Sequence, residues 1–300
     1  NTRQAMMEGQ NTIRGQCALR SMGLEGVPIA NVENACASGS TALWEAVSRI
    51  RAGLCEVALV AGAERMFFPE KREEMFKAFV GGTDVSTLDA TYDRLTSMGE
   101  GIEPPDDPRW QSAERSFFMD IYAAMARFHM KTFGTTQRQF AAAAAKNHRH
   151  STMNPLSQYQ TDMTVDEVLA DKPISWPFTR AMCAPISDGA AAAVVCAGSA
   201  LDRFDAARAV PERAVKVRGV ALVSGTDRPP EALDRHIGRR AALAAYDQAG
   251  VGPEDIDVAE VHDASAYAEI QQIENLGFCA SGEGGPFTET GATALGGSIP

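Results

Sequence analysis

The stretch from Asn34 to Ser40 places one thiol, that of Cys36, between two segments of regular pattern. Residues 28–32 form a short apolar run that predicts a buried strand, and the apolar side chains after Cys36 recur at helical spacing until Gly53. Cys36 is therefore expected at or near a helix N-terminus, where unpaired backbone N–H groups and the helix dipole favour a thiolate. A thiolate there could attack a carbonyl carbon. The alternative is a small buried cysteine without a function.

A second reactive side chain, that of His262, follows a similar pattern. Residues 256–261 predict a strand, His262 and Asp263 a turn, and residues 265–276 a helix. This order repeats the one around Cys36. In a fold of two related halves equivalent turns can face each other, so Cys36 and His262 are expected to share one pocket although they lie 226 positions apart. The alternative for His262 is a structural histidine that only makes hydrogen bonds.

The elements that would position these residues alternate in type along the chain. Residues 1–97 alternate between helical and strand patterns, with the clearest strand at 57–60, and this indicates a parallel sheet covered by helices. Three prolines mark a break after residue 97. The later elements expected from the pattern are helices at 117–133, 137–147 and 241–249 and a strand at 190–197, and residues 215–223 are expected to begin a second alternating α/β half.

We therefore predict an α/β fold of two duplicated halves with one inserted, mainly helical loop domain. The N-terminal half is expected to comprise residues 1–97 and 183–205, the insertion residues 98–182, and the C-terminal half residues 206–300. A chain of 300 residues with 45% hydrophobic content can bury a core of this size.

Composition excludes several classes of function. The formal charge of −11 argues against broad nucleic-acid binding, which needs clustered Lys and Arg. The longest apolar run, residues 57–63, is far too short to span a bilayer, and no signal segment opens the sequence, so we predict a cytoplasmic protein. The basic run at residues 146–150 is either a patch for an anionic cofactor or, more often for such runs, a solvated face.

No metal site is expected. The six cysteines are scattered, without a Cys-x-x-Cys pair or a histidine at metal-binding spacing, so they are predicted to be reduced thiols. The glycine-rich stretch at 282–285 lacks the Lys-Ser/Thr ending of a phosphate-binding loop, and Ser187–Gly189 predicts a tight structural turn.

The segment around Cys36 resembles the nucleophile segment of thiolases, most closely the branch similar to sterol carrier protein-x thiolase. Five further segments occur in the order that this family shows. They are Ala61-Gly62-Ala63-Glu64-Arg65-Met66, Lys146-Asn147-His148-Arg149-His150-Ser151, Asn154-Pro155, Pro185-Ile186-Ser187-Asp188-Gly189-Ala190 and Val261-His262-Asp263-Ala264. One such segment would be weak evidence, but five in order are strong.

The resemblance implies a fold and a site. It implies a layered α/β/α/β/α core with an inserted helical loop domain, Cys36 as nucleophile and His262 as the residue that stabilises an oxyanion. Met119 resembles a family methionine on the pantetheine side of the pocket, and Ala264 the small residue of the oxyanion loop. Coenzyme A would be a co-substrate, with no tightly bound cofactor, and the protein a homodimer or homotetramer that binds acyl-CoA.

The chain departs from the family in two respects. Ser265 stands where the family has an aromatic residue, which changes the expected shape of the acyl or pantetheine channel. The sequence also opens at Asn1 without an initiator methionine and stops at Pro300, before the family's Gly-His-Pro and Cys-x-Gly loops. We therefore expect a chain truncated at both ends.

Three functions remain open. The favoured one is a CoA-dependent acyltransferase that cleaves 3-ketoacyl-CoA, or condenses acyl-CoA, through an acyl-cysteine at Cys36, in fatty acid or sterol side-chain degradation. The second resembles thiolase-like lipid-transfer proteins, which cleave β-hydroxyacyl-CoA by a retro-aldol step in complex with a small partner subunit. Tyr267 would then be a candidate for proton transfer. The third is a non-catalytic acyl-CoA-binding relative.

Overall fold

The computed structural model describes residues 5, 7–111, 116–204 and 210–300. The chain forms two compact units. Unit 1 comprises Asn1–Ser86 and Ile186–Leu222, and unit 2 comprises Thr87–Pro185 and Val223–Pro300. These units are defined by internal compactness, and the predicted division into two duplicated halves with an insertion stays a prediction.

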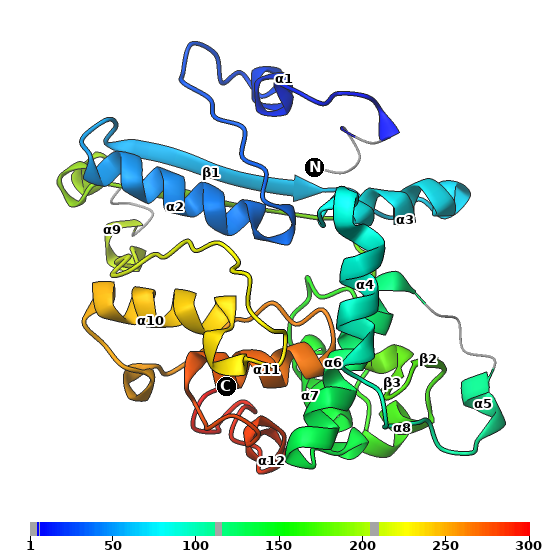
Figure 1. The fold of residues 1–300 in the computed structure, drawn as a ribbon. Helices are drawn as coiled ribbons and strands as arrows, with labels where there is room; N and C mark the ends of the chain where they lie inside the picture. Colours follow the sequence, from blue (N-terminus) through cyan, green and yellow to red (C-terminus); the bar gives the residue numbers. More distant parts are fainter. Residues whose placement is uncertain (1–4, 6, 112–115, 205–209) are drawn as a thin grey trace. The chain divides into compact units, whose positions relative to one another are not determined.

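Unit 1 is built on one antiparallel pair of strands with a helix against it (Figure 1). Strand β1 pairs with β4 along its whole length, with Val57 opposite Cys196 and Glu64 opposite Gly189. Helix α2 packs on this pair and buries Ala46 and Val47. The elements of unit 1 are α1 (Arg14–Ser21), η2 (Ala35–Ala37), α2 (Ser38–Arg51), β1 (Val57–Glu64), η3 (Pro69–Lys71), α3 (Arg72–Val80), β4 (Gly189–Cys196), η6 (Gly198–Arg203) and α9 (Val210–Arg213).

The strand pairing differs from the parallel arrangement that the sequence pattern indicated. An apolar run indicates that a strand tends to be buried. The direction of that strand relative to its neighbour depends instead on the path of the chain between the two strands, and helices α4 to α8 lie between β1 and β4 in the sequence. The predicted strand at 190–197 is present one residue earlier, yet its first six residues are exposed rather than buried. The residues that α2 leaves uncovered include Leu59 and Val194, which are partners in the ladder.

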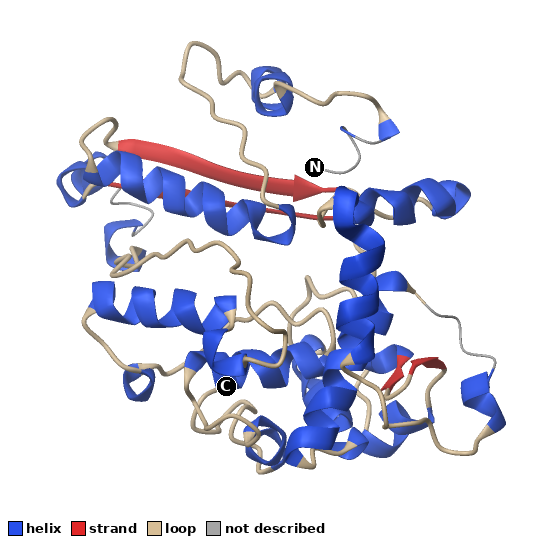
Figure 2. Cartoon of the chain, viewed as in Figure 1, coloured by secondary structure: helices blue, strands red, loops and turns tan. Residues whose placement is uncertain are grey.

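Two other predicted strands, at 28–32 and 256–261, do not form ladders within the described part of the chain. A strand needs a neighbour whose backbone N–H and C=O groups pair with its own, and an apolar run alone does not supply one. Helices and loops therefore make up most of the structure (Figure 2).

Unit 2 is mainly helical, and its long helices lie where the sequence predicted them (Figure 1). Helix α6 begins after Ser116, whose hydroxyl accepts the Met119 N–H, and ends at Gly134 in the left-handed conformation. Helix α7 begins with a capping box between Thr136 and Gln139. The elements are α4 (Leu88–Ser97), α5 (Pro108–Gln111), α6 (Phe117–Phe133), α7 (Gln137–Ser151), α8 (Val165–Ala170), β2 (Pro173–Ser175), β3 (Phe178–Thr179), η5 (Arg180–Met182), η8 (Leu233–Arg235), α10 (Ile237–Ala249), η9 (Pro253–Asp255), α11 (Ala266–Leu276) and α12 (Gly284–Glu289), while the turn η4 (Val85–Thr87) spans the sequence boundary between the units.

The core of unit 2 lies between α6, α7, α8 and α11. Helix α7 presents buried alanines at residues 141 and 143–145, so the neighbouring helices can approach its backbone closely. Large side chains fill the remaining space, and the rings of Phe178 and Tyr267 meet that of Phe140 edge-on. This core fixes the start of α11, which carries the loop that contains His262.

Among the described residues, no helix combines the length and the apolar character needed to cross a bilayer.

Candidate functional site

Cys36 lies in the short turn η2, immediately before α2, so its predicted place at a helix N-terminus is confirmed. Its side chain is exposed. The preceding residue, Ala35, has a φ of 46°, which is in the left-handed region that side chains with a Cβ rarely adopt. Such strained turns persist when surrounding contacts hold them, and they occur often at functional sites.

Hydrogen bonds from both sides hold this turn. The Ser38 hydroxyl accepts the Asn34 N–H at 2.8 Å and donates to the Ala35 carbonyl at 2.7 Å. The Glu33 carboxylate accepts the Ala35 N–H at 3.1 Å. Helix α2 begins after Ala37, whose side chain makes no capping hydrogen bond. The thiol therefore stands on a rigid turn beside N–H groups that could stabilise a negative oxygen.

His262 lies in unit 2 and is exposed, in the loop that leads into α11. Two backbone contacts with residues 183 and 184 hold this loop. The Ala264 carbonyl accepts the Ala184 N–H at 3.1 Å, and Ser265 pairs with Cys183 in an isolated bridge. Ser265 is buried, and its hydroxyl accepts the Ala268 N–H as the cap of α11. The serine that replaces the family's aromatic residue thus begins the helix.

A buried polar cluster lies behind this loop. The Lys146 ammonium donates to Glu269 at 2.6 Å, and the Asn147 amide donates to Glu269 at 2.5 Å and to Asp263 at 3.1 Å. The Glu269 side chain is 4% exposed and that of Lys146 16%. Lys146 therefore belongs to a buried ion pair, and neither sequence interpretation of residues 146–150, a cofactor patch or a solvated face, describes it. The signal that could have located the cluster is Glu269, which is a charged residue among the apolar positions of α11.

Burial and the nearby charge of Glu269 raise the pKa of the Asp263 carboxyl to about 6, although a backbone hydrogen bond and the charges of Lys146 and His262 act to lower it. The pKa in the folded state lies above the ordinary value of 3.8. Between these two pH values the folded protein keeps a proton on Asp263 that the unfolded chain has released. The stability contributed by protonated Asp263 is thus present below about pH 4 and lost as the pH rises through about 6.

We expect Asp263→Asn to remove this pH dependence. The asparagine carbonyl can still accept the Asn147 amide but carries no charge. The fall in the free energy of unfolding between about pH 4.5 and about pH 7 should be smaller in the variant than in the wild type by about 1–3 kcal/mol. Urea denaturation at both pH values measures it. Equal falls in the two proteins would contradict the raised pKa.

Two protein-family models match the sequence of the chain. The model of the thiolase N-terminal domain matches residues 1–172, and a second model, of the thiolase C-terminal domain-like family, matches residues 228–300. The chain belongs to the thiolase family. The resemblance inferred from the motifs around Cys36 and His262 is thereby confirmed.

Curated thiolase relatives match almost the whole chain. The rat (Rattus norvegicus) sterol carrier protein 2 is 31% identical over 298 residues, which cover 96% of this chain and 50% of the rat protein. An acetyl-CoA acetyltransferase of Methanothermobacter thermautotrophicus is 34% identical, with coverage of 93% and 65%, and the benzoylsuccinyl-CoA thiolase subunit BbsB of Thauera aromatica is 29% identical, with coverage of 95% and 66%. The chain thus spans about half the length of sterol carrier protein 2.

Solved structures confirm the α/β thiolase-like fold. The Ltp2–ChsH2(DUF35) aldolase superposes with a TM-score of 0.68 at 22% identity, covering 96% of this chain and 69% of that one. The dimeric peroxisomal thiolase of Saccharomyces cerevisiae superposes with a TM-score of 0.55 at 17% identity, covering 90% and 67%. At these identities the likeness concerns the fold alone.

The remaining predicted site residues have distinct surroundings. Met119 is half-buried in the first turn of α6, and its N–H donates to Ser116. Tyr267 is buried in the core, where burial raises its pKa and its hydroxyl accepts the Gln271 amide at 3.0 Å. The Tyr267 hydroxyl therefore has a structural partner within the core.

The catalytic pairing itself stays a prediction. Cys36 belongs to unit 1 and His262 to unit 2, and each side chain is defined within its own unit. The roles of Cys36, His262, Met119 and Ala264 are therefore proposals. Among the described residues, no group of His, Cys, Asp and Glu side chains has the arrangement of a metal site.

Proposed function

We propose that the chain is part of a CoA-dependent acyltransferase of thiolase type, with Cys36 as the nucleophile. The observation that supports the proposal is the exposed Cys36 thiol on a strained, hydrogen-bonded turn at the start of a helix, in a member of the thiolase family. Acetyl-CoA acetyltransferase and benzoylsuccinyl-CoA thiolase among the relatives point to the same chemistry.

In thiolysis the Cys36 thiolate attacks the ketone carbon of a 3-ketoacyl-CoA. The bond between the α and β carbons breaks, its electron pair moves onto the thioester as an enolate, and a proton completes acetyl-CoA. Coenzyme A then attacks the acyl-cysteine through its thiolate, which regenerates Cys36 and releases a shortened acyl-CoA. Backbone N–H groups at the start of α2 and the imidazole of His262 would stabilise the two developing oxyanions.

Coenzyme A would act in this scheme as a co-substrate rather than as a resident cofactor. Met119 and Ala264 are the candidates for contacts with its pantetheine arm. A homodimer fits two observations: the yeast thiolase in the comparison is dimeric, and Leu59 and Val194 expose apolar side chains next to each other on the strand pair. The cytoplasmic location and the lipid-degradation pathway stay predictions.

A retro-aldolase is the second candidate, because the Ltp2–ChsH2(DUF35) aldolase has the same fold. Such an enzyme would cleave β-hydroxyacyl-CoA with a small partner subunit and would not acylate a cysteine. Whether an acyl group forms on Cys36 therefore distinguishes the two candidate functions.

The full-length protein that contains this chain should become acetylated when it is incubated with acetyl-CoA. We expect peptide mass spectrometry to find one acetyl group on the peptide with Cys36 and none on the peptide with Cys17, which is also exposed in unit 1 but is not in a thiolase motif. An unmodified Cys36 together with cleavage of a β-hydroxyacyl-CoA would instead support the aldolase. An unmodified Cys36 without either activity would support a non-catalytic relative.

A further inference from the structure

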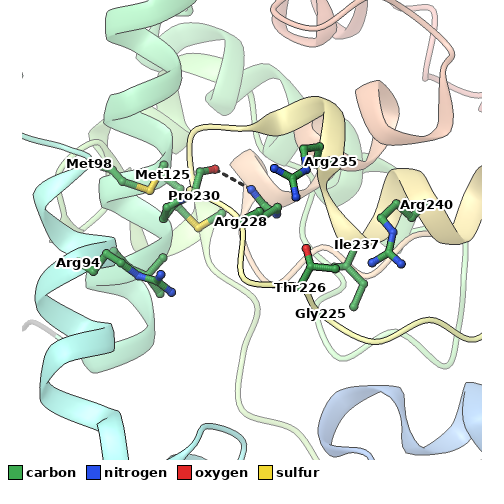
Figure 3. A pocket seen from close by; sticks show the side chains of 11 residues that line it. Arg94, Met98, Met125, Gly225, Thr226, Arg228, Pro230, Arg235, Ile237 and Arg240 are labelled. Carbon is green, nitrogen blue, oxygen red and sulfur yellow. Dashed lines mark hydrogen bonds between the residues drawn. The ribbon is translucent and has the colours of Figure 1, made fainter.

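Unit 2 contains a cavity of about 190 Å³ with a strongly positive lining. Arg94 comes from α4, Arg228 and Arg235 from the segment before α10, and Arg240 from α10 itself (Figure 3). The lining has no Asp or Glu among the described residues. A positive concavity in a protein with a net charge of −11 is a local feature, and such a cavity concentrates anions.

Internal contacts satisfy only part of this charge. The Arg228 guanidinium donates to the carbonyls of Pro229, Pro230 and Ala232, and that of Arg240 donates to the Ser224 carbonyl. These contacts hold the loop, but carbonyl oxygens carry no net charge. In the part of the chain that the structure describes, none of the four arginines of the cavity forms an ion pair, and the side chains of Arg94 and Arg235 make no hydrogen bond.

Two of the arginines, Arg228 and Arg235, repel each other. Burial and the charge of Arg235 lower the pKa of the Arg228 guanidinium, more than Asp234 and Glu231 raise it. Figure 3 shows the side chains of Arg228 and Arg235 near each other. Guanidinium groups in this position suit oxygen anions, which they can bind with two parallel hydrogen bonds.

The lining of the cavity also contains apolar side chains. Its apolar lining includes Met98 and Met125, which lie near each other in Figure 3, and Ile237, which lies apart from them beside Arg240; Met98 is buried. A bare inorganic anion would gain nothing from these side chains, whereas a short hydrocarbon chain would be removed from water. The volume is below the roughly 300–1,000 Å³ of sites for drug-sized ligands, so it admits only a few non-hydrogen atoms.

We propose that this cavity binds a carboxylate carried on a short hydrocarbon chain. The carboxylate would lie at the guanidinium groups, and the chain against apolar side chains of the lining such as Met98 and Met125. Two sources have this chemistry: the free carboxylate of a dicarboxylic acyl group on CoA, and a free small dicarboxylic acid. The first rests on the proposed function, while the second does not.

Titration calorimetry of the full-length protein with succinate tests the site without any catalysis. We expect succinate to bind, the neutral analogue succinamide not to bind, and the double variant Arg94→Gln/Arg235→Gln to weaken succinate binding at least about tenfold, since hydrogen bonds to charged groups are lost. These two arginines are chosen because their side chains hold no part of the loop. The control is Arg149→Gln, an exposed arginine at the end of α7 that does not line the cavity, and it should change binding less than about twofold.

A second titration separates the two sources. A preference for glutaryl-CoA over pentanoyl-CoA that disappears in the double variant supports the acyl carboxylate, because the two thioesters differ only in the terminal group. Succinate binding without such a preference supports the free acid. The proposal is overturned if succinate does not bind, if the double variant binds it as the wild type does, or if inorganic phosphate binds at least as tightly. Because succinate binding does not involve Cys36, failure of the acyltransferase proposal would leave this result intact.

Discussion

Replacing Cys36 by alanine is expected to abolish acyl transfer while leaving the fold intact. The variant lacks the sulfur that attacks the ketone and holds the acyl group, so turnover of a 3-ketoacyl-CoA with CoA should fall at least about 1,000-fold. The side chain is exposed, and therefore its removal creates no cavity in a core. Steady-state kinetics of the full-length protein measure the loss, and circular dichroism checks the fold.

The matched control is Cys17→Ala. Cys17 is also an exposed thiol of unit 1, but it lies in α1. Turnover in this variant should stay within about twofold of the wild type, because surface substitutions away from a site have small effects. Full thiolase turnover in Cys36→Ala would contradict the assignment of the nucleophile. Retained β-hydroxyacyl-CoA cleavage in Cys36→Ala, with no thiolase activity in the wild type, would identify the aldolase.

The helices could be predicted from the sequence because their ends carry local signals. Helix α6 lies at the predicted bounds between Ser116 and Gly134, and α10 ends at Gly250, where φ is 66°. A capping hydroxyl or a left-handed glycine acts on its own turn, so the surrounding tertiary structure does not change its meaning. The helix that follows Cys36 could be predicted from its apolar spacing and from Gly53, a left-handed glycine just after its C-terminal end.

The strand pairing and the buried cluster could not be predicted in this way. Whether β1 runs parallel or antiparallel to its neighbour depends on a segment distant in the sequence. Lys146 looks like part of a basic surface run, and only the packing of α7 against α11 brings Glu269 to it. The arginines of the cavity likewise come from segments more than a hundred positions apart, and no local pattern relates Arg94 to Arg235.

The Lys146–Glu269 pair gives the second large expected effect, on stability. Replacing Lys146 by methionine keeps the long apolar part of the side chain but leaves the Glu269 carboxylate buried with only the Asn147 amide as a partner. Loss of one member of a buried ion pair typically costs about 3–5 kcal/mol, because the remaining charge is desolvated and uncompensated. We expect a decrease of this size in the free energy of unfolding of Lys146→Met, measured by urea denaturation.

Two further variants decide whether the uncompensated charge causes this loss. In Lys146→Met/Glu269→Gln the glutamine carbonyl can still accept the Asn147 amide and carries no charge, so most of the lost stability should return. Arg138→Met breaks the exposed pair with Asp166 and should cost less than about 1 kcal/mol. A loss in Lys146→Met no larger than in Arg138→Met would mean that the pair is not buried in solution. Asn147 also donates a hydrogen bond to Asp263, the residue next to His262. A large loss of stability in Lys146→Met would therefore show that the cluster which stabilises unit 2 also contacts the loop of the proposed oxyanion residue.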